Sequence, residues 1–578
     1  MSRPTRSLTI ATLLALSVAV WLPRFRGPID LRWDGGTYYV LGTSLAEGRG
    51  YRLLNEPGEI EAVQYPPLLP AIVAVHQWIL GSSDPMIVGH WLRLTFFVMF
   101  LVSVLVTYAL LERVLPPVWA FVAVSMCVLH LFSMFLSELL FAELPFLLVS
   151  LLFVLWSGVG GSRERPLLSW VCATLAYLLR TAGGALLIAW VGESLLRREF
   201  RRAAVRAAIA LVPIVGWQAY VASVEAGPSY AAPAYPYQRA AYVFYNVTYA
   251  TNLSLRDPFQ PELGKASLRD LTVRVARNLT RLPQSIGEAV SADKRDWHDL
   301  LDRLPGAQLR GSTYVRSWAV PVALTGLGML VLVGTAIQLG RWGRLVGLYV
   351  LAYCGTVCLT PWPAQWRRYW FPVAPLLVLA LVQCLLWIGR RVILTASASG
   401  RFVARMLPAV LVAGVLVVEL FTVLHAYHTI RGDAVLHDER GSPVRFSLFW
   451  YGQPDRERDA ALEWLHGRGR PGDVVANAMP HWAHLLTGMK TVVPPFEQDP
   501  VRAEALLDSV PIRYIVMDPD TTRMMRGSTE AITHADGRWT QIYSSSSGLV
   551  GVYERTPAIR TEEVAEGMKP RPSDAPVR

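Results

Sequence analysis

The chain has 578 residues, of which 53% are hydrophobic and only 17% are charged, and its mean hydropathy is positive at +0.33. A soluble domain of ordinary composition carries more charge, so much of this chain is expected to face lipid. The net charge of +11 does not indicate nucleic-acid binding, because the basic residues form short clusters between apolar stretches, as they do where they set membrane orientation.

The first predicted element is an uncleaved apolar helix at residues 8–22. Two arginines precede it, as in a signal peptide, but the sequence WLPRF that ends it offers no small-residue cleavage site. We therefore predict a first membrane span with a cytoplasmic N-terminus, followed by an outer loop at residues 24–85. Residues 66–81 within that loop are apolar but short, which favours an interfacial or re-entrant helix.

Apolar stretches bounded by charge, Gly or Pro predict the remaining spans, and hydropathy gives about eleven spans in all. These stretches lie near residues 86–111, 117–136, 139–158, 167–180, 182–196, 205–224, 317–338, 345–361, 370–389 and 405–425. One alternating assignment places the arginine clusters of the short loops on the cytoplasmic side. An odd number of spans then puts the C-terminus outside, together with a second long outer segment at residues 225–316.

The chain after residue 430 alternates between helical and strand patterns. Helices are predicted at residues 455–469 and 500–510, and strands at DVVANA, RYIVMD and GLVGVYER. This alternation predicts a small extracytoplasmic α/β domain at residues 430–555, after a membrane module at residues 1–429. Residues 556–578 are polar and Pro-rich and are expected to be disordered.

Acidic residues in the first outer loop are the first candidate site residues. Asp34 opens the sequence DGGTYY, with Tyr38 and Tyr39 as candidate substrate contacts, and Asp30 is a second acidic candidate. An Asp before a helix commonly serves only to cap it. From these residues alone, capping is the favoured role of Asp34.

Two further acidic residues, Glu138 and Glu143 in LSELLFAELPFLL, lie at or just inside the outer boundary of a predicted span. Ionisable groups at that depth are costly and are more often functional than not. The alternative is that both side chains snorkel to the surface from a helix end.

Three arginines lie on the predicted outer side, where the charge rule does not expect them. Arg180 interrupts two hydrophobic stretches in LLRTAGG, and Arg367 and Arg368 stand among aromatic residues, including Tyr369, in PWPAQWRRYWFPVAP. A lipid phosphate would satisfy them, because a guanidinium binds phosphate through two parallel hydrogen bonds. An ion pair with Glu138 or Glu143 is an equally good explanation of Arg180.

These motifs and the layout of the chain resemble the GT-C glycosyltransferases, multi-spanning enzymes that transfer a sugar from a polyprenyl-phosphate carrier. In that class an acidic residue stands shortly before an aromatic residue outside the first span, a pattern matched here by Asp34 and Tyr38. The class often has an acidic residue where Glu138 stands, and an Arg-Tyr followed by Pro where the sequence reads RRYWFP. The resemblance does not separate the protein O-mannosyltransferase group from the lipid A aminoarabinose transferase group.

The resemblance implies an inverting transfer outside a bacterial plasma membrane. Asp34 would accept the proton of the acceptor hydroxyl, and Arg367, Arg368 and Arg180 would hold the carrier phosphate. Glu138 would orient a sugar hydroxyl or a metal ion, and the need for a divalent cation stays open because members of the class differ. The sugar, hexose or pentose, and the envelope acceptor, a lipid, a glycan or a protein, also stay open.

The main alternative is a transporter or flippase of lipid-linked sugars, which would use the same arginines without a base. Carriers usually keep ionisable groups or broken helices near the middle of the membrane. The charges singled out above cluster at the outer boundary instead, which favours the transferase. The sequence has no Walker, Rossmann or zinc-protease motif, and its five cysteines show no metal-ligand spacing.

Overall fold

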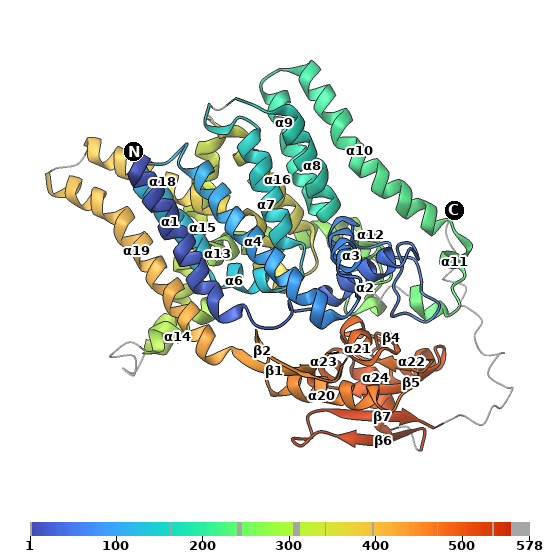
Figure 1. Ribbon diagram of the computed structural model, residues 1–578. Coiled ribbons are helices and arrows are strands. Elements are labelled where there is room, and N and C mark those ends of the chain that lie inside the picture. Colours follow the sequence, from blue (N-terminus) through green and yellow to red (C-terminus); the bar gives the residue numbers. More distant parts are fainter. Residues whose placement is uncertain are drawn as a thin grey trace.

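The computed structural model describes residues 3–161, 163–239, 245–303, 312–340, 343–395, 398–438, 440–470, 472–534 and 537–556. Helices of the first three quarters of the chain form one bundle, and the C-terminal domain packs against one end of it (Figure 1). The disorder predicted for residues 556–578 concerns a segment that, after Thr556, lies outside the described residues.

Six helices in the described part of the chain are long and apolar enough to cross a membrane. They are α1 (Arg3–Trp21), α4 (Pro85–Leu111), α10 (Phe200–Glu225), α15 (Ser312–Leu339), α18 (Ala374–Thr395) and α19 (Ala398–Thr429). Helices α5 (Pro117–Leu129) and α6 (Leu131–Glu138) form a seventh candidate span that bends by 55°. The span predicted at 117–136 is therefore broken, because His130 has an extended backbone with ψ of 124°.

Five shorter apolar helices complete the bundle. They are α3 (Leu68–Leu80), α7 (Glu143–Trp156), α8 (Pro166–Leu179), α9 (Gly184–Leu196) and α16 (Arg344–Leu359). Helix α3 is the short helix expected at residues 66–81. A count of about eleven spans requires some of the other short helices to cross as well, so that number stays a prediction.

The two outer segments contain helices of their own. They are α2 (Asp34–Ala46) in the first segment, and α11 (Pro228–Ala231), α12 (Tyr249–Ser254), α13 (Leu268–Ala289) and α14 (Lys294–Arg303) in the second. Helix α17 (Trp366–Trp370) precedes α18, and short 3₁₀ helices lie at Leu22–Arg24, Val159–Gly161, Thr181–Gly183, Pro236–Arg239, Pro261–Leu263, Pro363–Gln365 and Phe371–Val373.

Helix α13 is amphipathic and packs along α15 rather than lying free in a loop. The Ser267 hydroxyl and Asp270 cap its N-terminus reciprocally. Where the helices cross, a Cβ on Gly287 would collide with the carbonyl of Leu324, and one on Gly328 would collide with the carbonyl of Pro283. The glycines thus allow the two backbones into direct contact.

The C-terminal domain has a five-stranded sheet in the order β4-β3-β5-β7-β6 and a separate β1-β2 hairpin. Strand β3 runs parallel to β4 and β5, and β7 runs antiparallel to β5 and β6. The strands are β1 (Arg431–His437), β2 (Pro443–Phe449), β3 (Val474–Ala476), β4 (Lys490–Val492), β5 (Ile512–Met517), β6 (Trp539–Ser544) and β7 (Gly551–Arg555). The helices are α20 (Gln453–His466), α21 (Pro480–Thr487), α22 (Pro500–Asp508), α23 (Pro519–Met524) and α24 (Arg526–His534).

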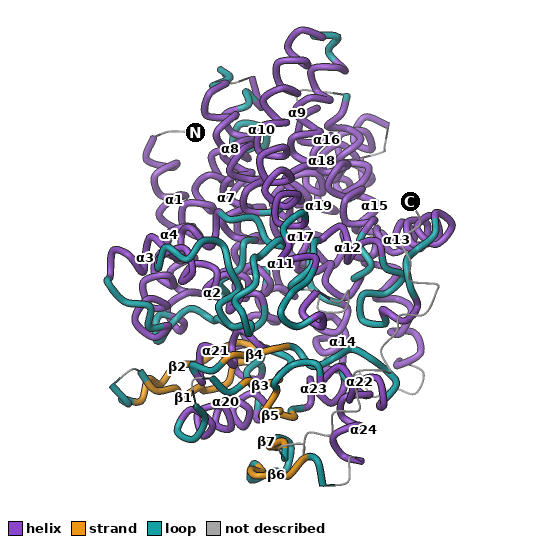
Figure 2. The backbone as a smooth tube through the Cα atoms, turned by 90° about the vertical axis from the view of Figure 1, so that its right-hand side faces the viewer, coloured by secondary structure: helices purple, strands orange, loops and turns teal. Residues whose placement is uncertain are grey.

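The predicted α/β character of this domain is confirmed. The central strands β3 and β5 are almost entirely buried, as expected for short apolar runs inside a mixed sheet. The tube view shows the domain below the helical bundle, with the strands confined to it (Figure 2). The N-terminal end of α1 and the connection between α9 and α10 lie at the opposite end of the bundle (Figure 1).

Candidate active site

A cavity of about 630 Å³ lies between the C-terminal domain and the end of the bundle that faces it. Its size suits a small-molecule site. The bundle supplies side chains from α2, α6, α16 and α17, and the C-terminal domain supplies others, including Met479, Phe496 and Arg523. The C-terminal domain therefore forms part of the wall of the cavity.

Asp34 and Arg368 meet in this cavity. The Nη1 atom of Arg368 lies 2.6 Å from Oδ2 of Asp34. Asp34 is the first residue of α2, and the N-cap position belongs to Trp33. The carboxylate thus faces an arginine from a helix more than 300 residues away in sequence, rather than serving as the N-cap residue.

Glu143 contacts Arg368 of this pair and connects it to Arg180. Its fully buried carboxylate forms ion pairs with the guanidinium groups of both Arg368 and Arg180. Glu143 is the first residue of α7, and Arg180 stands in the break between α8 and α9. Two carboxylates and two guanidinium groups therefore form one continuous, formally neutral cluster. Arg180 is therefore ion-paired with Glu143, one of the two partners that the sequence offered, and its role as a phosphate ligand stays a prediction.

Arg367 points to a different acidic residue. It forms an ion pair with Asp293, a buried residue just before α14. The ring of Tyr369 packs beneath the Arg180 guanidinium, whose carbon lies 5.6 Å from the ring centroid. Arg367 and Tyr369 line the cavity together with Arg368, so the RRYWFP motif contributes three consecutive side chains to it.

Aromatic residues form the wall next to Asp34. The rings of Tyr38 and Tyr65 meet edge to face with their centroids 4.9 Å apart, and Tyr245 and Tyr249 also line the cavity. Burial, together with the nearby Asp34 carboxylate, raises the pKa of Tyr38 far above its ordinary value, so its hydroxyl stays neutral. Tyr39 is on the other side of α2, where its hydroxyl donates to the carbonyl of Ser83 at 2.9 Å.

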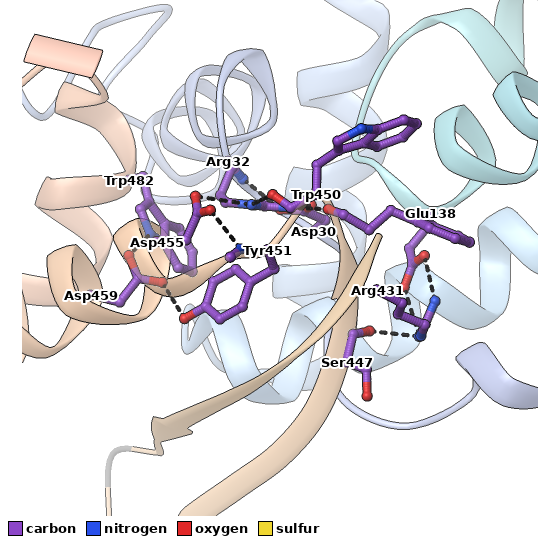
Figure 3. Close-up of polar contacts among 12 residues, drawn as sticks. Asp30, Arg32, Glu138, Arg431, Ser447, Trp450, Tyr451, Asp455, Asp459 and Trp482 are labelled. Carbon is purple, nitrogen blue, oxygen red and sulfur yellow. Dashed lines mark hydrogen bonds and ion pairs between the residues drawn. The ribbon is translucent and has the colours of Figure 1, made fainter. Parts of the chain in front are cut away.

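Asp30 and Glu138 do not line the cavity. Asp30 pairs with Arg32, whose Nη2 lies 2.7 Å from Oδ2 of Asp30. Glu138 ends α6 and pairs with Arg93 at 3.3 Å. It also pairs with Arg431 at 3.1 Å (Figure 3). Both carboxylates therefore form ion pairs next to the cavity and do not face into it. Glu143, on the next helix, contacts the cluster that Glu138 was expected to join.

Several residues that line the cavity were not predicted from the sequence. Tyr65 opens the sequence YPPLLP, and Tyr245 and Tyr249 belong to an aromatic-rich part of the second long segment, residues 225–316. An aromatic stretch between charged segments was the available signal for these. Asp520 and Arg523 come from α23, and nothing in the sequence places that helix next to Asp34.

The residues around the cavity do not match a divalent-cation site. Among the described residues, no group of three or more His, Cys, Asp or Glu side chains could hold a metal ion. Mg²⁺ and Ca²⁺ need several oxygen ligands at once, whereas Asp34 and Glu143 each face guanidinium groups.

Comparison with solved structures identifies the fold. The oligosaccharyltransferase AglB from Archaeoglobus fulgidus, in complex with an inhibitory peptide and a dolichol-phosphate, aligns with a TM-score of 0.50 at 11% identity, over 97% of this chain and 76% of that one. The same enzyme in complex with Zn and sulfate aligns with a TM-score of 0.50 at 12% identity, over 95% of this chain and 73% of that one.

ArnT from Cupriavidus metallidurans, bound to undecaprenyl phosphate, aligns with a TM-score of 0.49 at 12% identity, over 96% of this chain and 99% of that one. No protein-family model matches the chain, and no curated protein matches it in sequence. The two AglB alignments show that the chain has the GT-C fold, the fold implied by its sequence motifs.

Proposed function

We propose that this protein is a membrane glycosyltransferase that moves a sugar from a polyprenyl-phosphate donor to an extracytoplasmic acceptor. The observation that carries the proposal is the contact of Asp34 with Arg368 inside the cavity. One residue can accept a proton and the other can bind phosphate.

The donor would lie with its phosphate near Arg180 and Arg368. Both guanidinium groups line the cavity, and both can exchange a carboxylate partner for a phosphate oxygen. Apolar side chains on other walls of the cavity would hold the first isoprene units; they include Phe132, Phe135, Leu136, Leu179 and Leu359. The AglB structure, with a dolichol-phosphate, supports a lipid phosphate as the donor group.

The proposed reaction is a single inverting displacement at the anomeric carbon. The acceptor hydroxyl attacks that carbon and its proton passes to Asp34. The bond from the anomeric carbon to the phosphate oxygen breaks, and its electron pair stays on the phosphate. Asp34 becomes neutral as the phosphate gains one negative charge, so the total charge of the site does not change.

Arg368 would couple donor binding to release of the base. Without the donor its guanidinium is paired with the Asp34 carboxylate. When a phosphate takes over the guanidinium, the carboxylate becomes free to accept a hydrogen bond from the acceptor hydroxyl. The base would thus be active when the donor is bound, and Arg367, held at Asp293, would add positive charge beside the leaving phosphate.

The ends of the bundle support an orientation with the cavity outside. The N-terminal end of α1 and the arginine-rich start of α10 lie at the end opposite the C-terminal domain (Figure 1). Basic loops favour the cytoplasm. We therefore propose that the N-terminus is cytoplasmic in a bacterial plasma membrane and that the cavity takes an envelope lipid, glycan or protein as acceptor.

The proposal is tested with purified protein and two variants. Asp34→Asn keeps the size of the side chain but removes the base, so it should bind polyprenyl phosphate normally while transfer falls by about 10²- to 10⁴-fold. Arg368→Lys keeps the charge but cannot form two parallel hydrogen bonds, so it should weaken binding of polyprenyl phosphate. Near-normal turnover of Asp34→Asn would refute the base, and unchanged phosphate binding by Arg368→Lys would refute the donor site.

One observation favours the rival function of transport. Glu419 is buried within α19, and its Oε2 atom has no hydrogen-bond partner in the described part of the structure. An ionisable group inside a span and the bent pair α5 and α6 are features of carriers. A flippase would not need Asp34 as a base, so movement of the lipid-linked sugar would survive Asp34→Asn.

A further inference from the structure

Arg32 is fully buried and is bonded to two parts of the chain at once. Its guanidinium donates to Asp30 within the first outer loop, at distances of 2.7, 3.1 and 3.2 Å. It also donates to the C-terminal domain: to the carbonyls of Phe449 at 2.7 Å and Trp450 at 2.9 Å, and to Asp455 at 3.2 Å (Figure 3). Five donors in a rigid plane make Arg suited to such a junction, and Lys could not reproduce it.

The residue between Arg32 and Asp34 has a strained backbone. Trp33 has φ of 53° and ψ of −128° and forms the N-cap of α2. Bulky residues rarely adopt a positive φ, so the surrounding contacts must hold Trp33 in this conformation. Its ring packs against the Arg32 guanidinium, with 4.5 Å from the guanidinium carbon to the ring centroid. The direction in which α2 starts, and so the place of Asp34, depends on how Arg32 is held.

The C-terminal domain contacts α2 just beyond Asp34 as well. A Cβ on Gly36 would lie 2.9 Å from Cβ of His481 and 3.1 Å from the backbone nitrogen of Trp482, so α21 lies directly on the first turn of α2. The hydroxyl of Thr37 forms a hydrogen bond with Nδ1 of His481 at 3.0 Å. Burial lowers the pKa of His481 to about 3, so this imidazole is neutral.

Asp30 extends the same connection toward Glu143. The amide of Asp30 donates to the carbonyl of Glu138 at 3.0 Å, and the amide of Leu140 donates to the carbonyl of Asp30 at 3.0 Å. This short ladder holds the segment that leads into α7, whose first residue, Glu143, contacts Arg368. The Asp30–Arg32 pair therefore fixes the chain on the approach to both carboxylates of the cluster.

We propose that Arg32 is a positioning residue for Asp34, and that the C-terminal domain sets the geometry of the catalytic carboxylate through Phe449 and Trp450. The proposal rests on the proposed function, but it deepens it: the domain completes the active site instead of merely covering it. Asp30, in this account, positions Arg32 and does not take part in proton transfer.

The test compares Arg32→Lys with a control at the same boundary. Lys490 also crosses from the C-terminal domain to the outer loop, where it donates to the carbonyl of Leu54 at 2.6 Å and to Glu59 at 2.8 Å, but that segment does not lead to Asp34. Arg32→Lys should lower kcat by about 10²-fold and leave the donor KM unchanged, because a small displacement of a catalytic group suffices for such a loss. Lys490→Met should change neither constant.

A double-mutant comparison separates positioning from a general structural role. If Arg32 acts through Asp34, then Arg32→Lys has no further effect on the residual transfer by Asp34→Asn. A further loss of similar size, or a raised donor KM, would overturn the proposal. If Arg32→Lys does not fold, Asp455→Asn removes only the partly exposed end of the junction and should produce a smaller loss of kcat in the same direction.

A chemical-reactivity measurement at position 34 tests the positioning role of Arg32 without requiring sugar transfer. The thiol of Asp34→Cys would be titrated with a charged methanethiosulfonate in detergent solution. Adding Arg32→Lys should change its reaction rate several-fold, whereas adding Lys490→Met should not. An unchanged rate would overturn the positioning role even if transfer is established, and a changed rate would uphold it even if no donor supports transfer.

Discussion

Glu56 is a buried carboxyl of the first long loop, residues 24–85, and its raised pKa predicts that the stability of the protein depends on pH. It accepts hydrogen bonds from Gln238 at 2.8 Å and Asn246 at 3.0 Å, from the second outer segment. Burial raises the pKa of Glu56 from 4.5 to about 7, against the opposing effect of these two amides. Burial outweighs the two amides, so Glu56 keeps its proton in the folded protein up to a pH of about 7.

The stability contributed by Glu56 should decrease as the pH rises. Between pH 4.5 and about 7 the folded protein holds a proton that the unfolded chain has lost, so the free energy of unfolding falls by roughly 3 kcal/mol across this window. Thermal unfolding from pH 5 to pH 8 should show a fall in Tm that is clearly smaller in Glu56→Gln. Identical pH profiles for the two proteins would rule out this account of Glu56.

At the residue scale, the sequence predicted site residues where a reactive or charged side chain stands at an unusual place in the chain. Arg180 and the arginines of RRYWFP could be singled out because basic residues are unexpected at an outer boundary. Asp34 and Tyr38 could be singled out through the GT-C resemblance, and all of these residues line the cavity. Glu138 and Glu143 were singled out for the same reason, an acidic residue near the end of a predicted span. Glu138 turns away from the cavity because the chain bends at His130 and because Arg93 and Arg431 bind its carboxylate. The sequence pattern shows neither the bend nor these partners.

At the scale of elements, the crossing of α13 and α15 is the most demanding contact of the bundle. Gly328 has no room for a Cβ against the backbone of Pro283, whereas Gly326 on the same helix faces open space. Gly328→Ala should therefore destabilise the protein by about 1–3 kcal/mol through overpacking. Gly326→Ala, the matched control, should be neutral or slightly stabilising because Ala favours helix.

Thermal denaturation of both glycine variants in detergent checks this prediction. Equal Tm values for Gly328→Ala and the unmodified protein would show that the helices do not cross as closely as the structure has them. Helix α13 controls the site indirectly, because the indole of Trp370, next to the arginine pair, donates to Ser285 of α13 at 2.7 Å. A loss of packing there should also reduce transfer.

Hydropathy predicted the long helices well because a span is a local property of about 20 residues. It missed α13, although its apolar residues at 271, 275, 282 and 286 follow a helical period. It also missed the β1-β2 hairpin and the edge strands β4 and β6. Short strands are fixed by their partners, and their pairing is not visible in the sequence of one strand.

At the scale of the whole molecule, the helical bundle and the C-terminal α/β part line one cavity together. The outer loop, the arginines of the late span and the C-terminal domain are far apart in sequence, and they meet because α19 runs directly into β1 (Figure 1). The sequence predicted both parts but not their contact. Long-range contacts of this kind depend on groups such as Arg32 whose partners lie more than 400 residues away.

The central claim is that the protein consumes a polyprenyl-phosphate sugar with Asp34 as the base. The most direct test is mass spectrometry of membrane lipids, glycans and glycoproteins from cells without the protein, restored with either the unmodified protein or Asp34→Asn. We predict that one polyprenyl-phosphate sugar accumulates without the protein, stays high with Asp34→Asn, and falls with the unmodified protein as a glycosylated product appears. Equal donor levels and equal products in all three would contradict the claim.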